Sequence, residues 1–268
     1  MKNLKYTFIF TLLTMLFSSC EEVETVELKS AEEKYVIEGN LSNLLGSATI
    51  SISRTKNADV SGSFNGISGA VVTITDESGK VSRLTESNTI GIYTDPFLKG
   101  IPETNYRLKV AIDGQTFTAA SKMPSKSKLE AVGQLEASAL DGKRKFSTVK
   151  FNDPAGKGHA YRFIEYRNGI YNKVISVIND ELFDGNSTLQ VLRPKSFTED
   201  TRYNVGDQIK IEFLNIDAPV FKYWFSSDKG IQSIGENTTP INPASNINGG
   251  ALGYFSAHSL QSMEYTVK

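Results

Sequence analysis

The sequence contains a single cysteine, and the residues around it decide what that cysteine can do. Two lysines and about a dozen mainly apolar residues precede the pair Ser18-Ser19 and then Cys20. This order predicts a lipoprotein signal peptide over residues 1–19, with cleavage before Cys20 and lipid on its thiol. The alternative is an ordinary signal peptide with an incidental cysteine. Once Cys20 is acylated no thiol remains, which excludes disulfides, cysteine zinc sites and cysteine nucleophiles.

Long apolar runs and an excess of basic charge are also missing. The N-terminal run is shorter than the roughly 20 residues that a transmembrane helix needs, so we expect attachment to the membrane through lipid on Cys20. Without Lys2 and Lys5, 27 of the 29 basic residues remain against 30 acidic ones, a net charge of −3. Binding to nucleic acid calls for a stripe of basic residues, which this net charge does not suggest. No nucleic-acid partner is therefore expected.

Histidine, the usual residue of acid–base and metal chemistry, occurs only twice. His159 and His258 lie in different parts of the second half, without an HxH, HxxxH or HExxH spacing. Both are therefore expected to be surface or loop histidines. The chain also has no Gly-x-Ser-x-Gly motif. We expect no catalytic residue, no cofactor and no metal site, and the sequence favours a protein that is not an enzyme.

One group of oxygen-bearing side chains surrounds Gly185. It consists of Asp180, Glu181, Asp184 and Asn186. Such side chains are calcium ligands, but their spacing matches no standard calcium-binding loop, so a solvated turn is favoured.

The segment after Cys20 is strongly acidic. Residues 20–33 contain six glutamates and one lysine, which predicts a solvated tether. Glu21, Glu22 and Glu24 resemble the export signal that sends lipoproteins of Bacteroidota to the outer face of the outer membrane. The apolar residues between them leave room for part of the tether to add an edge strand.

From residue 34 onward, short alternating runs are separated by turn residues, which is typical of antiparallel β structure. Asp113-Gly114 lies between two such runs and predicts a tight hairpin. We expect an immunoglobulin- or transthyretin-like β-sandwich over residues 34–124, with a domain boundary in the polar segment that follows. Strands are expected near residues 35–38, 48–53, 70–75, 81–85, 106–112 and 115–121.

Residues 125–268 predict a second β-rich, sandwich-like domain with one short helix. Asp217 can cap a helix over about residues 218–229, in which Pro219 occupies the first turn and the aromatic face, with Trp224, packs on the sheet. Residues 237–259 are expected to form an ordered loop. Strands are expected near residues 129–137, 146–151, 159–166, 171–178, 208–213 and 264–267.

Three motifs carry a resemblance to a known family. They are Tyr-Val-Ile-Glu-Gly at 35–39, Phe-Asn-Asp-Pro at 151–154, and the segment 243–257 that contains Gly253-Tyr254-Phe255. With Cys20 and the acidic leader, they resemble the Bacteroidota outer-membrane lipoprotein family called domain of unknown function 4249. The resemblance implies a surface lipoprotein that serves a TonB-dependent transporter in nutrient uptake, and it implies no catalytic residues.

The sequence is also consistent with two other functions. Tandem sandwiches also serve as adhesins or structural interaction proteins, and a surface hydrolase is the third, least favoured candidate. For a partner or ligand surface we expect Tyr254, Phe255 and Trp224, because the aromatic residues gather in the second half.

Overall fold

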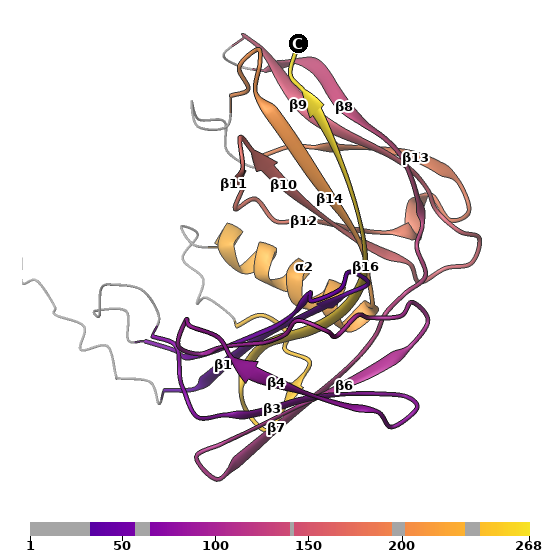
Figure 1. Ribbon diagram of the computed structural model, residues 1–268. Helices are drawn as coiled ribbons and strands as arrows, with labels where there is room; N and C mark the ends of the chain where they lie inside the picture. Colours follow the sequence, from indigo (N-terminus) through magenta and orange to yellow (C-terminus); the bar gives the residue numbers. More distant parts are fainter. Residues whose placement is uncertain (1–32, 57–64, 140–141, 195–201, 234–241) are drawn as a thin grey trace, which may run out of the picture. The chain divides into compact units, whose positions relative to one another are not determined.

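A computed structural model describes residues 33–56, 65–139, 142–194, 202–233 and 242–268 (Figure 1). Residues Glu33–Lys268 form one compact unit. Within the described residues strands dominate and α2 (Ala218–Ser233) is the one α-helix, which confirms the mainly β fold class. The strands form a 13-stranded sheet and a separate sheet of three strands.

The first region contains the strands expected in the N-terminal half. The strand β4 pairs with β5 on one side and with β3 on the other, so it joins two layers that pack on each other. The region also contains β15 and the first part of β16, which come from the end of the chain. The bounds are β1 Tyr35–Ser42, β2 Ala48–Arg54, β3 Val71–Asp76, β4 Val81–Glu86, β5 Ile92–Asp95, β6 Asn105–Ile112, β7 Gln115–Lys122, β15 Ile247–Asn248 and β16 Leu252–Thr266.

The alternation in the sequence determines which side chains form the core between these layers. In β6 the residues Tyr106, Leu108, Val110 and Ile112 are buried, and those between them are mostly exposed. The predicted hairpin joins β6 to β7, with positive φ angles of 49° at Asp113 and 73° at the glycine that follows. The alternation of apolar and polar residues therefore predicts which side chains of β6 are buried, and the Asp-Gly pair predicts the observed hairpin.

The strand β16 differs most from the expectation. Residues 252–259 were expected in a loop, but they begin a 15-residue strand. Residues Leu252 to His258 pair in parallel with β1, and Ser259 to Thr266 pair antiparallel with β14 (Gln208–Ile216). The strand pairing therefore does not follow the domain boundary predicted at residues 124/125, because β16, which comes from the C-terminal half, pairs with strands of both regions.

The second region pairs a three-stranded sheet with the remainder of the large sheet. The order β13-β9-β8 faces β11-β10-β14-β16, and β12 also pairs with β10. The expected strand over residues 171–178 is two short strands, and β13 was not anticipated. The bounds are β8 Lys128–Ala139, β9 Gly142–Asn152, β10 Ala160–Arg167, β11 Ile170–Tyr171, β12 Ser176–Asn179, η2 (a 3-10 helix) Asp180–Leu182, β13 Ser187–Leu192 and β14 Gln208–Ile216.

Successive side chains of β10 and β14 point to opposite faces of the sheet, and both faces are buried. One face packs on the three-stranded sheet through an aromatic cluster that includes Phe151, Tyr161 and Phe213. The opposite face packs on α2 through Leu214, Ile216 and other apolar side chains. This sheet is therefore covered on both faces: aromatic side chains of β10 and β14 pack toward the three-stranded sheet, and aliphatic side chains of these strands pack toward α2.

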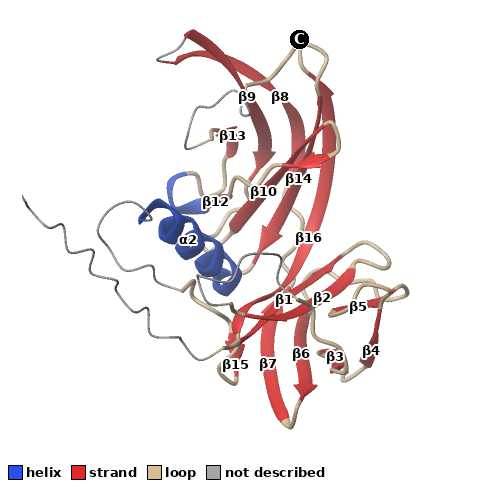
Figure 2. Ribbon diagram, turned by 90° about the vertical axis from the view of Figure 1, so that its left-hand side faces the viewer, coloured by secondary structure: helices blue, strands red, loops and turns tan. Residues whose placement is uncertain are grey.

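The helix α2 spans Ala218–Ser233 and lies against β10, β12 and β16 (Figure 2). It begins where the sequence predicts, because Asp217 Oδ1 accepts a hydrogen bond from Val220 N at 3.1 Å. It continues past Gly230, where the sequence predicts its end. Among the described residues, no helix has the length and apolarity to cross a bilayer.

Candidate functional site

The residues expected to attach the protein to a membrane lie outside the described part of the chain. Cys20, Glu21, Glu22 and Glu24 belong to residues 1–32, whose structure is not described. Lipidation and the export signal therefore stay predictions.

The expected aromatic surface is mostly buried. Phe255 is fully buried in the core of the first region, and Tyr254 is 5% exposed. Tyr254 packs against Trp224, with ring centroids 5.0 Å apart, and the guanidinium of Arg162 lies 3.4 Å from the Trp224 ring centroid. The expectation of a surface at Tyr254 and Phe255 is therefore wrong, because both side chains join β16 to its neighbours.

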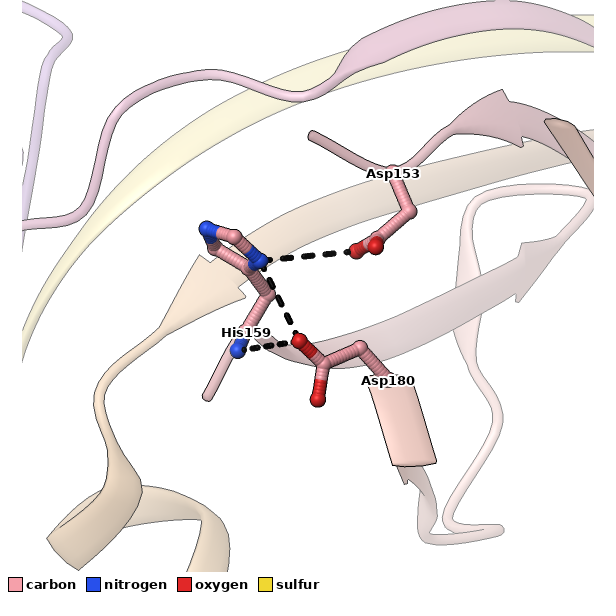
Figure 3. Close-up of side chains that lie close together, drawn as sticks. All are labelled: Asp153, His159 and Asp180. Carbon is pink, nitrogen blue, oxygen red and sulfur yellow. Dashed lines mark hydrogen bonds and ion pairs between the residues drawn. The ribbon is translucent and has the colours of Figure 1, made fainter. Parts of the chain in front are cut away.

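The structure brings together three ionisable side chains from separate segments of the second region (Figure 3). Asp153 follows β9, His159 precedes β10, and Asp180 opens η2 after β12. His159 Nδ1 lies 3.2 Å from Asp180 Oδ2 and 3.8 Å from Asp153 Oδ1. One ligand atom from each residue lies within 4.8 Å of the others. His159, expected to be a surface or loop histidine, is thus held between two carboxylates.

Hydrogen bonds from the protein hold both carboxylates in place. Asp153 accepts from the hydroxyl of Tyr161 and, at 2.9 Å, from Gly185 N. Asp180 Oδ2 accepts from His159 N at 2.9 Å. Burial and the hydrogen bond to Asp153 raise the pKa of Tyr161, so its hydroxyl keeps the proton that it donates. The carboxylates are therefore oriented by groups that remain donors at neutral pH.

The environment of Asp180 favours its charged form. Burial by itself raises the pKa of this carboxyl, but the amides of His159 and Gly158 and the charge of the His159 ring outweigh burial and lower it. The calcium arrangement considered from the sequence does not form. Asp184 Oδ1 instead accepts from Gly156 N at 2.7 Å, while Asp180 turns toward His159.

No motif in the sequence could have identified this cluster. Its members are separated by 6 and 21 residues, and β10 and β12 lie between two of them. The antiparallel pairing of Ala160, the first residue of β10, with Asn179, the last residue of β12, brings His159 next to Asp180. An oxygen-rich turn around Asp180 and a histidine before a strand were the only signals available.

A second feature of this region is a cavity of about 540 Å³ between the two sheets. Its lining includes four basic and two acidic side chains, together with aromatic residues. The charged residues are Lys145, Arg167, Lys173, Arg193, Glu165 and Asp207.

Glu165 forms the centre of a buried polar network at this cavity. Its Oε2 accepts hydrogen bonds of 2.5 Å from Ser147 Oγ and from the Tyr203 hydroxyl, and its Oε1 accepts one of 3.1 Å from Asn172 Nδ2. The Tyr265 hydroxyl lies 2.9 Å from Ser147 Oγ, and burial raises the pKa of Tyr265 to about 12. The Glu165 carboxylate is therefore satisfied by the protein, whereas the basic residues Lys173 and Arg193 are exposed at the cavity.

Comparison with known proteins identifies the family. Residues 21–264 match the family described as domain of unknown function (DUF4249). The chain belongs to this family. No curated protein matches it.

Two solved structures are similar to this DUF4249 chain at low sequence identity. One is a DUF4785 family protein from Legionella pneumophila, at 10% identity over 70% of this chain and 54% of that chain, with a TM-score of 0.27. The other is a segment of two fibronectin type-III domains from chicken tenascin, at 13% identity over 70% and 93%, with a TM-score of 0.23. Similarities at this level carry no argument about function.

Two of the three motifs of the DUF4249 resemblance are neighbours in space. Tyr35 to Gly39 lie in β1, and residues 252–258 lie beside them in β16, with Ile37 opposite Gly253 and Gly39 opposite Phe255. The third motif, residues 151–154, supplies Asp153 of the three-residue cluster.

Proposed function

We propose that the protein is a lipid-anchored, non-enzymatic accessory component of a TonB-dependent nutrient uptake system in the outer membrane. The predicted lipid on Cys20 and the acidic residues after it support the location. Membership of the DUF4249 family is compatible with this role and does not by itself specify it. We place the protein on the outer face of the membrane, beside a transporter.

The observation that carries the binding role is the cavity of about 540 Å³ in the second region. Its volume lies in the range of small-molecule sites. Glu165 accepts three hydrogen bonds from the protein, and Asp207 accepts others from Asn168 and Asn204. The basic side chains Lys173 and Arg193 are exposed at the cavity. The exposed basic side chains and the apolar part of the lining favour a small ligand with an anionic group and an apolar part.

The location and the partner are tested by purification from the native membrane. The lipoprotein is extracted from detergent-solubilised outer membrane, and we expect a transporter barrel to copurify. The Cys20→Ala variant, which cannot be acylated, is the matched control and should be lost from the membrane fraction. Recovery of the wild-type protein without any barrel would contradict the proposed partner.

The cavity is tested by growth on a limiting nutrient. Deletion of the gene should slow growth, and the double variant Lys173→Ala/Arg193→Ala should fail to restore it. The control variant Lys99→Ala/Lys109→Ala removes two exposed cations from the first region and should restore growth fully. An adhesin would bind partners but produce no growth defect on deletion.

A further inference from the structure

We propose that Asp153, His159 and Asp180 bind a divalent cation of the zinc type. The ion would join three segments of the second region: the end of β9, the entry to β10 and the start of η2. The site is separate from the cavity at Glu165, since none of the three residues lines that cavity.

The distances fit a shared ion. Zinc lies about 2.0–2.2 Å from nitrogen and oxygen ligands, and in a tetrahedral site two such ligands are about 3.3–3.6 Å apart. His159 Nδ1 lies 3.2 Å from Asp180 Oδ2 and 3.8 Å from Asp153 Oδ1. Both separations are close to that range, so small rotations of the carboxylates would complete the geometry.

The charges of the cluster favour a cation. The side chains of Asp153 and Asp180 are 0% and 3% exposed. Among the described residues, His159 is the only basic side chain within ion-pair range of either carboxylate. Two buried carboxylates beside one imidazole leave an excess of negative charge, which is costly in a protein interior. A divalent ion would neutralise it.

The imidazole is oriented as a ligand rather than as a hydrogen-bond donor. Its Nδ1 is buried and makes no hydrogen bond within the described structure, although Asp180 Oδ2 is within distance. The oxygen lies off the direction of a ring N–H, so this contact leaves Nδ1 unsatisfied. In Figure 3 Nδ1 faces both carboxylates, whereas the second ring nitrogen points away from them.

The surrounding residues provide the support that metal ligands usually have. The Tyr161 hydroxyl and Gly185 N hold Asp153, and the backbone amide of His159 holds Asp180. The network continues through Ser127, whose Oγ lies 3.0 Å from the Tyr161 hydroxyl and accepts from Asn215 Nδ2 at 2.6 Å.

A second cavity borders the cluster at His159, although neither Asp153 nor Asp180 lines it. His159 is 28% exposed through its side chain and lines a cavity of about 270 Å³ together with Asn215. Asn215 is almost fully buried, and its Oδ1 has no hydrogen-bond partner within the described residues. Water in this cavity could therefore donate a hydrogen bond to that oxygen.

The donor set selects the class of metal. Calcium takes six to eight oxygen ligands, and this cluster offers two carboxylates and one nitrogen. One imidazole with two carboxylates suits zinc and related transition ions. Because the ion would hold three segments together, its main effect is expected on stability.

The test is zinc binding by the purified, tag-free chain after removal of metal with a chelator. Isothermal titration with ZnCl₂ should show one ion per chain, and zinc should raise the melting temperature. Co²⁺ should bind at the same site and give visible absorption bands. CaCl₂ should produce neither effect at comparable concentration.

Three variants separate a metal site from a structural histidine. His159→Gln and Asp180→Asn should each weaken zinc binding by about 100-fold or more and abolish the Co²⁺ bands. Asp184→Asn removes a carboxylate outside the cluster and should bind zinc as the wild type does. His159 is partly exposed, so His159→Gln remains an informative variant if Asp180→Asn does not fold.

Two outcomes would overturn the proposal. One is a wild-type chain that binds no zinc. The other is a folded His159→Gln variant that binds zinc as tightly as the wild type.

Discussion

Gly253 is a single residue on which the pairing of two distant segments depends. Its φ is 102°, and a Cβ at this position would lie 2.0 Å from the carbonyl oxygen of Ile37 in the neighbouring strand. Gly253→Ala should therefore lower the free energy of unfolding by about 3 kcal/mol or more, through backbone strain and displacement of β1. Urea denaturation monitored by circular dichroism measures the loss.

Gly250 provides the matched control for this prediction. Its φ is also positive, at 90°, but no atom lies within 4 Å of the position of a Cβ. Gly250→Ala should cost about 1 kcal/mol, the effect of backbone conformation alone. Equal losses for the two variants would show that close approach to Ile37 is unimportant.

His258 makes the stability of the protein depend on pH. Burial, together with the positive charge of Arg162, lowers the pKa of His258 to about 4 from its ordinary 6.5. The unfolded chain takes up a proton near pH 6.5, but the folded chain does so only near pH 4. The contribution of neutral His258 is therefore complete above pH 6.5 and is lost as the pH falls toward 4.

This linkage can be measured by comparing two proteins at two pH values. Between pH 7 and pH 5 the wild type should lose about 2 kcal/mol more unfolding free energy than His258→Gln, which has no group to titrate there. Other ionisable groups affect both proteins, so the difference isolates His258. Parallel pH profiles for the two proteins would contradict the lowered pKa.

At the scale of elements, the start of α2 is joined to the first region through one side chain. Asp217 Oδ1 caps the helix, and its Oδ2 accepts from Ser121 Oγ at 2.8 Å and from Lys122 N at 3.0 Å at the end of β7. Asp217→Ala should lower the free energy of unfolding by about 2–3 kcal/mol, because the cap is lost and two donors are left unpaired. Chemical denaturation is the measurement.

The variant Asp217→Asn separates the two roles of this residue. It keeps an oxygen for the helix cap but replaces Oδ2 with an amide group that cannot accept from Lys122 N. Its stability should lie between those of the wild type and Asp217→Ala. If Asp217→Asn is as stable as the wild type, the contacts with β7 contribute little.

At the scale of the whole molecule, β16 makes the two regions depend on each other. Its residues Leu252 to His258 cover the edge of β1, and its side chains Phe255 and Ala257 belong to the core of the first region. A fragment of residues 33–124 lacks this strand, so it should remain largely unfolded. Circular dichroism and dispersion of amide resonances measure its structure.

A fused chain gives the control for the fragment. Residues 245–258 joined to the fragment through a flexible linker should restore folded structure, because they supply β15 and the parallel partner of β1. A fragment 33–124 that folds without them would mean that the boundary expected from the sequence is sufficient for an independent domain.

Local features of the fold could be predicted from particular residues. The alternating burial of β6, the turn at Asp113-Gly114 and the cap at Asp217 follow from side-chain period, turn chemistry and hydrogen bonding over a few residues. The parallel pairing of β1 with β16 could not be predicted, because periodicity shows which face of a strand is buried but not which strand lies beside it.

By itself the sequence determined the mainly β class, the start of the helix and the absence of free thiols beyond Cys20, since each depends on composition or on neighbours in the chain. Only the tertiary structure decided that β16 serves two regions, that Phe255 is core, and that Asp153, His159 and Asp180 meet. These features arise where strands distant in sequence come together, and long-range packing selects their partners and register.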